Sequence, residues 1–295
     1  MDAFWIITTG FLVAAAGGLL GSFLLLRKMT MIGDAISHAI LPGIVIAYLI
    51  ADARTSLVML IGAAIFGILV TVVIELFHQK GKLQEDAAIG VAFTWLFAVG
   101  VILITYFADS VDLDQDCVLY GEIAYIPLDT WKIGILEIPK TTLLLLGNLL
   151  IVLAFVVVGY KGLVIASFDE IAARALGIST AFWHYALMSL VSLTTVFSFE
   201  AVGSILVVAF LVVPAATAFL LTRQLKKILL YSVLIGLLSS LGGYALAVII
   251  DGSIAGAMAS FAGILFGLAW LANIFMHKKS ASAEQSEHLL QSDST

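Results

Sequence analysis

Residues 4–26 read FWIITTGFLVAAAGGLLGSFLLL, a run without a single charged side chain. A helix needs roughly 20 mostly apolar residues to cross the ~30 Å hydrocarbon layer of a membrane. The run is too long for the apolar core of a signal peptide, and no basic segment precedes it. We therefore predict that it is the first membrane helix of the chain and not a cleaved signal.

The composition of the whole chain extends this prediction. Of the 295 residues, 62% are hydrophobic and 12% are charged, whereas a soluble domain is nearer half apolar and a quarter charged. So few charges cannot coat a soluble globule, but the lipid-facing side of a helix bundle needs no such coat. The net charge of −6 gives no sign of a nucleic-acid partner. A soluble globular protein is excluded, and the lipid bilayer is the expected environment.

Continuous apolar runs of this length predict helices, because only helices and closed barrels satisfy their backbone polar groups in lipid. The predicted fold is an all-α polytopic membrane bundle of about eight or nine transmembrane helices. The expected spans are 4–26, 33–51, 56–77, 87–108, 142–160, 180–199, 202–222, 227–250 and 254–276. Residues 1–278 would form the transmembrane domain. The polar stretch 279–295 has no apolar face to bury and is predicted to be a disordered cytoplasmic tail.

Basic residues predict the orientation, because Lys and Arg concentrate in cytoplasmic loops. With nine spans and the N-terminus outside, eleven of the fourteen Lys and Arg residues fall in inner loops, and the C-terminus is cytoplasmic. An outer loop holds alternating carboxylates at Asp112, Asp114 and Asp116, followed by the single cysteine, Cys117. This segment is either a cation-gathering outer vestibule or an ordinary solvated loop, and it lacks the glycine and closing glutamate of an EF-hand.

Asp34 and His38 are ionisable residues inside the expected span 33–51. Such groups are costly in lipid unless they are paired, hydrated or liganded, so they mark a functional site by default. Because they are four residues apart, they lie one turn from each other on one face of a helix. A carboxylate and an imidazole together suit Mn, Fe or Zn, provided that other helices supply further ligands. The residue types favour a metal or proton path over a pair that only stabilises helix packing.

Three further features interrupt the apolar spans. Pro42 and Gly43 follow the Asp–His pair and predict a broken helix, which is tolerated in a membrane beside a cavity or a neighbouring helix. Pro214 predicts a second break or a plain kink. Glu200 lies between two apolar runs, either in a tight outer turn or as a third metal ligand or gate residue.

Two other ionisable residues lie near the predicted inner ends of spans. Glu75 is expected to extend toward water or to pair with Lys80 or Lys82. His184, with aromatic residues on both sides of it, is interpreted as an interfacial anchor. Both are therefore predicted to be boundary residues.

The predicted cytoplasmic segment 166–178 reads ASFDEIAARALGI. Ser167 or Asp169 can cap a short helix, and Gly177 can end it. The apolar residues of this helix form one stripe: Phe168, Ile171, Ala175 and Leu176. A short amphipathic helix of this kind is either an interfacial filler or a docking element for a partner protein.

Three of these segments together resemble one protein family. The stretch GDAISHAILPG at residues 33–43 resembles the signature of the permease subunits of zinc and manganese ABC importers. The segment 168–177 is similar to the coupling helix of importer permeases, on which the ATPase docks. Its candidate contact residues are Phe168, Asp169, Glu170, Ala172, Ala173, Leu176 and Gly177. Residues 202–218 resemble the family's late span, and 112–129 are most similar to the manganese-transporting members.

The resemblance implies a type II-like importer fold in a bacterial cell membrane. Two permease chains, identical or related, would enclose a central path. Cytoplasmic ATPase subunits would dock on the coupling helices, and an extracellular metal-binding lipoprotein would deliver the ion. In this chain Asp34 and His38 would contact the metal, with Glu200 as a further candidate. The chain would be a transport subunit and not an enzyme, without a permanently bound cofactor.

Two other functions compete with this one. A proton-coupled secondary transporter would use Asp34 and His38 as a proton relay and would need no ATPase. An intramembrane metalloenzyme is disfavoured, because the chain has no His-Glu-x-x-His run. The chain also has no Gly-rich phosphate loop followed by Lys-Ser or Lys-Thr, so ATP hydrolysis is expected in a separate subunit.

Overall fold

Helix α1 (Asp2–Leu26) lies in the interior of the helix bundle. The computed structural model describes residues 2–51, 56–107, 123–133 and 136–292. Within them, α1 packs against α7 (Lys140–Phe168), α9 (Thr180–Leu221) and α10 (Leu225–Ile250). Glycine permits the closest approach, because a Cβ at Gly21 would overlap the carbonyl oxygen of Leu211 on α9. The first predicted span is thus surrounded mainly by other helices.

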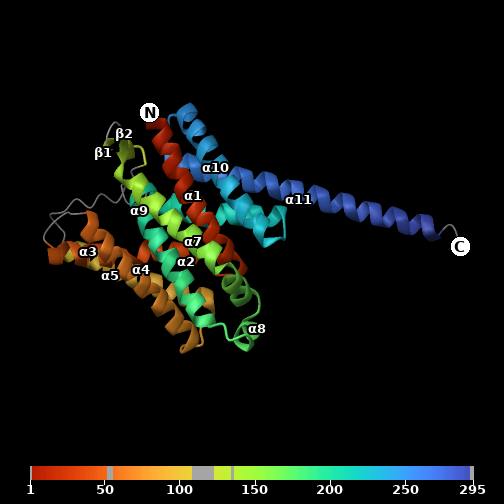
Figure 1. Ribbon diagram of the computed structural model, residues 1–295, viewed down its shortest axis with the longest axis horizontal. Helices are drawn as coiled ribbons and strands as arrows, with labels where there is room; N and C mark the ends of the chain where they lie inside the picture. The colour runs from red at the N-terminus through yellow and green to blue at the C-terminus, as the bar shows by residue number, and fades with distance from the viewer. Residues whose placement is uncertain (1, 52–55, 108–122, 134–135, 293–295) are drawn as a thin grey trace.

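In chain order the remaining elements are α2 (Ile32–Ala39), α3 (Leu41–Ala51), α4 (Ser56–Gln79), α5 (Glu85–Phe107), the short 3-10 helix η1 (Ile126–Leu128), strands β1 (Thr130–Ile133) and β2 (Leu136–Pro139), α8 (Glu170–Ala175) and α11 (Ile254–Ser292). Figure 1 shows how they are arranged, with α3, α4 and α5 together on one side of the bundle and α11 extending away from it. Eight candidate membrane spans lie in the described part of the chain. The predicted all-α bundle is confirmed. The antiparallel β1–β2 hairpin was not predicted, because four-residue strands are too short to show a clear period of two.

Two polar contacts identify the ends of the bundle. Arg27, directly after α1, donates a hydrogen bond from Nε to Ser167 Oγ near the end of α7, at 3.0 Å. We call this the Arg27 end. Thr9 of α1 bonds to Thr142 at the start of α7, with 2.9 Å between the hydroxyl oxygens, and this marks the Thr9 end. Helices α1 and α7 therefore run in the same direction.

The second span consists of two helices. Helix α2 ends at Ala39, and α3 begins at Leu41 with Pro42 in its first turn. Proline fits there because N–H groups of the first turn have no partner within their own helix. Pro42 lies against Gly100 of α5, and the neighbouring Gly43 lies against Gly62 of α4. The interruption therefore coincides with two close helix contacts.

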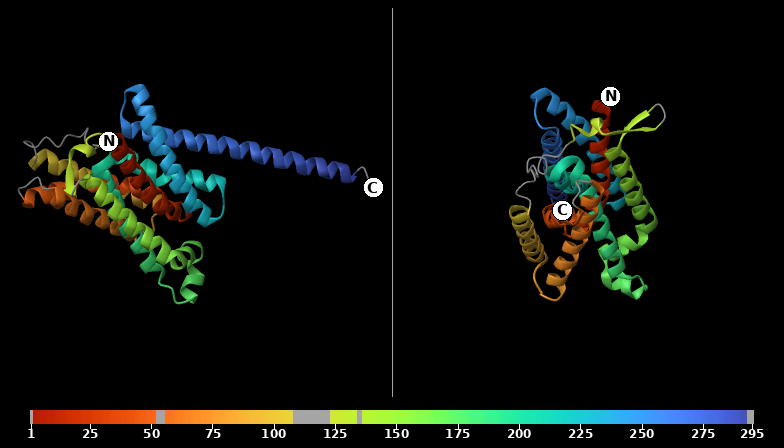
Figure 2. Two further views of the ribbon diagram at one scale, coloured as in Figure 1. Left: turned by 45° about the horizontal axis from the view of Figure 1, so that its top comes forward. Right: turned by 90° about the vertical axis from the view of Figure 1, so that its left-hand side faces the viewer.

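Helix α9 reverses direction at Gly203. Its 42 residues would extend roughly 63 Å if straight, about twice the hydrocarbon thickness. His184, in its second turn, contacts Arg27, whereas Ala201 and Val202 share a buried cluster with Ile6 at the Thr9 end. The chain then returns toward the Arg27 end, and Figure 2 shows the green and teal arms of α9 running in different directions.

The return is confirmed by the start of the next helix. Lys226, in the first turn of α10, lies over the ring of Tyr160 near the Arg27 end of α7, with Nζ 5.8 Å from the ring centroid. The two arms of α9 correspond to the predicted spans 180–199 and 202–222. With the arms taken separately, the described residues cross the bundle nine times.

The reversal of α9 lies at Gly203, beside the predicted boundary between the spans 180–199 and 202–222, and Pro214, which predicted a second break or a plain kink, does not break the helix. Gly203 has φ 76° and ψ 167°, a conformation open almost only to glycine. Pro214 lies inside the second arm, which stays helical around it. The missing proline N–H removes one helix bond, but this arm is held by close packing of Phe210 and Leu211 on glycines of α1.

Replacing Gly203 with alanine is expected to destabilise the protein by about 1–3 kcal/mol, because a Cβ strains this backbone conformation. The neighbours Val202 and Ser204 are buried and leave little room for the turn to relax. Thermal unfolding of the purified chain in detergent measures the effect. Gly147→Ala is the matched control, because a Cβ at Gly147 meets no atom within 4 Å. Equal melting temperatures for the two variants would contradict the assigned strain.

Helix α11 continues as one helix to Ser292, through most of the stretch predicted to be disordered (Figure 1). Two general properties account for this difference. Extending a formed helix costs far less than starting one, and the stretch contains two residues each of Ala, Glu, Gln and Leu, which favour helix. The division of the chain at residue 278 stays a prediction.

Candidate functional site

Asp34 and His38 lie side by side on α2. Asp34 Oδ1 is 3.6 Å from His38 Nε2, as their spacing of one helical turn predicts. The imidazole ring also touches two aromatic rings of α5, with centroids 6.0 Å from Phe93 and 5.6 Å from Phe97. Side-chain exposure is 35% for Asp34 and 32% for His38. The pair is therefore supported by α5 on one side and open on another.

The pair lies well inside the bundle along the direction of the helices. Ile36, between the two residues in sequence, faces Gly67 of α4. Gly67 is eight residues from Glu75, or roughly 12 Å along the helix, and Glu75 contacts His184 at the Arg27 end. An open carboxylate and imidazole at this depth are unfavourable against lipid. Their open side thus calls for a polar path, a ligand or another protein chain.

Within the described residues no group of three or more His, Cys, Asp or Glu side chains could hold a metal ion. Glu200 therefore does not complete a three-ligand site with Asp34 and His38. It is an exposed residue of α9, three positions before the reversal at Gly203. The reversal was predicted near this residue, but the glycine and not the glutamate forms it. The acidic residues Asp112, Asp114 and Asp116, together with Cys117, lie outside the described residues.

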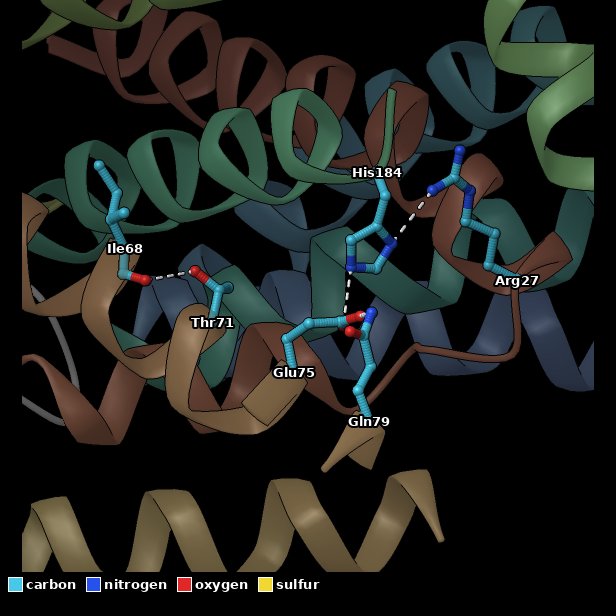
Figure 3. Close-up of polar contacts among 6 residues, drawn as sticks. All are labelled: Arg27, Ile68, Thr71, Glu75, Gln79 and His184. Atoms are coloured by element: carbon cyan, nitrogen blue, oxygen red, sulfur yellow. Dashed lines mark hydrogen bonds and ion pairs between the residues drawn. The ribbon is translucent and has the colours of Figure 1, made fainter. Parts of the chain in front are cut away.

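Glu75 and His184 form an ion pair or hydrogen bond that the sequence analysis missed. Glu75 Oε2 lies 3.0 Å from His184 Nε2, and the side chains are only 13% and 22% exposed. Figure 3 shows the carboxylate and the imidazole pointing toward each other from α4 and α9. The prediction that Glu75 pairs with Lys80 or Lys82 is therefore wrong. Both residues stood near the predicted inner ends of their spans, which was the signal available in the sequence.

The contact belongs to a network that joins four helices at the Arg27 end. Arg27 Nη1 lies 3.5 Å from His184 Nδ1, while Arg27 Nε donates to Ser167 of α7. Because a guanidinium can only donate, the tautomer that fits both contacts has Nδ1 of His184 accepting from Arg27 and Nε2 donating to Glu75. Gln79 donates to Glu75 from the next turn of α4 (Figure 3). The network thereby fixes α1, α4, α7 and α9 to one another.

Thr71, earlier in α4, takes no part in this network as drawn in Figure 3. Thr71, one turn before Glu75, donates its hydroxyl to the carbonyl oxygen of Ile68 at 2.6 Å (Figure 3). Its polar group is therefore satisfied within its own helix. Among the α4 side chains drawn in Figure 3, Glu75 is the one that reaches another helix.

A polar cavity of about 450 Å³ opens beside the network. Its lining includes Arg27, Glu75 and His184 together with Arg174 of α8 and Thr180 at the start of α9. The cavity thus lies between the ends of the membrane helices and the short helix α8. Both signs of charge are present, so it has no strong preference for either an anion or a cation.

Helix α8 has the caps that its sequence predicts. Asp169 Oδ1 accepts a hydrogen bond from the Ala172 backbone N–H at 2.9 Å. At the other end Gly177 has φ +72°, and the N–H groups of Gly177 and Ile178 bond to the carbonyl oxygens of Arg174 and Ala173. This pair of bonds is a Schellman motif. Local sequence therefore determines both ends of the helix.

One face of the α8 segment packs on this chain and the other is open. Ala173 is fully buried. Phe168, Ile171 and Leu176, from the predicted apolar stripe, are 62%, 83% and 68% exposed. Three large apolar side chains clustered on so short a segment are typical of a binding surface for another protein.

Known membrane proteins resemble this chain over about nine-tenths of its length. The chain is 47% identical over 268 residues to the manganese transport system membrane protein MntD of Bacillus subtilis (strain 168), with 90% of each chain covered. It is 40% identical over 263 residues to the zinc transport system membrane protein TroD of Treponema pallidum (strain Nichols), covering 88% of this chain and 71% of the relative.

A solved structure agrees with these relatives. PsaBC from Streptococcus pneumoniae, determined in complex with Fab, matches with a TM-score of 0.74 and 30% identity over 90% of each chain. The sequence profile described as the ABC 3 transport family matches residues 3–273, from the start of α1 into the last membrane span. The chain belongs to the ABC 3 transport family.

Proposed function

We propose that this chain is the membrane-spanning permease subunit of an ATP-binding-cassette importer that carries divalent metal ions into the cytoplasm. Manganese is the first candidate, because the relative that is 47% identical over nine-tenths of both chains is named for manganese transport. Zinc and iron suit the same donor atoms. The chain would act in a bacterial cell membrane, with the Arg27 end and the C-terminus on the cytoplasmic side.

The observation that carries the proposal is the open Asp34–His38 pair deep in the bundle. One carboxylate and one imidazole are too few to hold a first-row metal alone, and the described residues bring no third His, Cys, Asp or Glu side chain to them. A second permease chain, identical or related, facing the open side would double the ligands to two of each kind. Such a site, assembled between chains, can open and release its ion when the chains move apart.

A site that binds its metal tightly and permanently would not serve transport, because the ion must be released on the other side. A closed four-ligand cage within one chain holds its metal as a structural element. Ligands divided between two chains bind the ion only in the conformation that brings them together. The metal is therefore cargo, and selectivity rests partly on the extracellular metal-binding lipoprotein that would deliver it.

A continuous series of contacts links α8 to the metal pair. The residues between α8 and α9 are few, and His184 lies in the second turn of α9. His184 contacts Glu75 of α4, and Gly67 of α4 faces Ile36 of α2, between Asp34 and His38. A displacement of α8 by a cytoplasmic ATPase would therefore move the start of α9 and, through α4, the helix that carries the ligands.

Reconstitution into vesicles tests the proposal. The chain is purified from its native membrane with the subunits that accompany it, reconstituted, and assayed for Mn²⁺ accumulation. We expect accumulation with Mg-ATP and none with a non-hydrolysable ATP analogue. Accumulation driven by a pH gradient in vesicles that hold the chain alone would overturn the proposal in favour of a proton-coupled secondary transporter that uses Asp34 and His38.

A further inference from the structure

A groove of about 610 Å³ opens between α7 and α10 near the Arg27 end. Its lining is partly apolar and partly basic: Val156, Val157, Val158, Tyr160, Lys161, Lys226 and Leu229. Val156 and Leu229 are buried and form its floor, whereas Val157 and Val158 are 67% and 86% exposed. We propose that this groove binds one anionic phospholipid, with the phosphate at Lys161 and Lys226 and an acyl chain along the valines.

The depth of the two lysines fits a lipid headgroup. Lys161 is 21 residues after Lys140, the first residue of α7, which places the two roughly 32 Å apart along the helix. This separation matches the ~30 Å hydrocarbon layer, so each lysine lies at a membrane boundary. Lys226 is in the first turn of α10, over Tyr160, the residue directly before Lys161. The ammonium groups therefore lie at headgroup level, and Val156–Val158 lie one turn deeper.

The charge of the groove favours an anion. None of its seven described lining residues is acidic, in contrast to the cavity near Arg27, which contains Glu75 and Glu85. Two cations that share one groove repel each other, and a phosphate between them removes that repulsion. Basic pockets between membrane helices on the cytoplasmic side are suited to anionic headgroups. Tyr160 adds an aromatic ring and a hydroxyl at the same level.

The groove also lies away from the face that carries the metal pair. Asp34 and His38 are on α2, which packs against α4, α5 and α9, whereas the groove belongs to α7 and α10, which pack on α1. Helices α1 and α9 separate the two faces. The groove and the open side of Asp34 and His38 therefore belong to different faces of the bundle, and the lipid site rests on the proposed function only for its cytoplasmic orientation.

Native mass spectrometry of the purified full chain in detergent tests the site. The probes are phosphatidylglycerol and phosphatidylcholine with the same acyl chains. We expect the wild type to retain phosphatidylglycerol roughly ten- to thirtyfold better, because two lysines attract its net negative charge, whereas the choline ammonium of phosphatidylcholine cancels the charge of its phosphate and is repelled by the lysines. The double variant Lys161→Gln, Lys226→Gln should lose this preference. The matched control Lys80→Gln, Lys82→Gln removes two exposed charges from a turn after α4, at the same end, and should keep it.

A second variant distinguishes a lipid from a bare anion. Val157→Trp keeps both lysines but narrows the groove where the acyl chain would lie, and it should reduce phosphatidylglycerol retention at least severalfold. Soluble glycerol phosphate at millimolar concentration should not displace the lipid. Equal retention of both lipids by the wild type, an unchanged preference in the lysine variant, or displacement by glycerol phosphate would each overturn the proposal. All three readouts are independent of ATP and of metal uptake.

Discussion

Cells that produce the Asp34→Ala or the His38→Ala variant are expected to lose metal uptake by roughly a hundredfold or more. Each change removes half of the ligands that the chain offers, and even changes to residues behind a metal ligand cost about ten- to a hundredfold. The fold should not suffer, because the lost side chains are partly exposed at a depth where lipid disfavours them. Uptake of Mn²⁺ at matched expression and thermal unfolding in detergent measure the two effects separately.

Ser37→Ala is the matched control for this pair. Ser37 lies on the same helix but is buried, and its hydroxyl donates to the carbonyl oxygen of Gly33 at 2.9 Å. We expect this variant to retain most of its uptake. Uptake at the wild-type level in both Asp34→Ala and His38→Ala would instead assign the pair to helix packing and exclude it from the transport path.

The Ile171→Asp variant is expected to lose its ATPase partner and, with it, metal uptake. Ile171 is 83% exposed on α8, so a carboxylate there does not disturb the packing of this chain. In an interface, by contrast, a large apolar anchor contributes about 2 kcal/mol or more, and burying a charge in its place adds a penalty. Co-purification of the ATPase activity with the chain measures the interaction directly.

Ile171→Leu controls for the change of side chain, because it keeps an apolar group of the same volume. Its ATPase association should remain within a few-fold of the wild type. A secondary transporter would tolerate Ile171→Asp, since it needs no docking surface. Full ATPase association with the Asp variant would show that the open face of α8 has another purpose.

Sequence reasoning succeeded where a structure depends on neighbours along the chain. The caps of α8 follow from Asp169 and Gly177, each of which acts on backbone groups within a few residues. The spacing of Asp34 and His38 likewise fixes their proximity on one turn. Hydropathy identified both arms of α9 as separate spans, because each arm is long enough to cross a membrane by itself.

It failed where a structure depends on contacts between distant helices. Glu75 and His184 are 109 positions apart, and only the packing of α4 on α9 brings their side chains to 3.0 Å. The reversal of α9 was expected beside Glu200, the one charged residue of the stretch, yet a glycine three positions later provides the required positive φ. Pro214 was a poor guide to the break, since packing on α1 holds the helix around it.

The two arms of α9 constrain how the nascent chain enters the bilayer. Its 42 residues contain one charged side chain, Glu200, and no polar loop separates the two arms. Arg174 precedes the first arm and Arg223 follows the second, so the signals that retain a segment in the cytoplasm lie on both sides of the pair. With the Arg27 end on the cytoplasmic side, as proposed above, we expect the arms to insert together as a helical hairpin, with both ends held back and the Gly203 turn leading across the membrane.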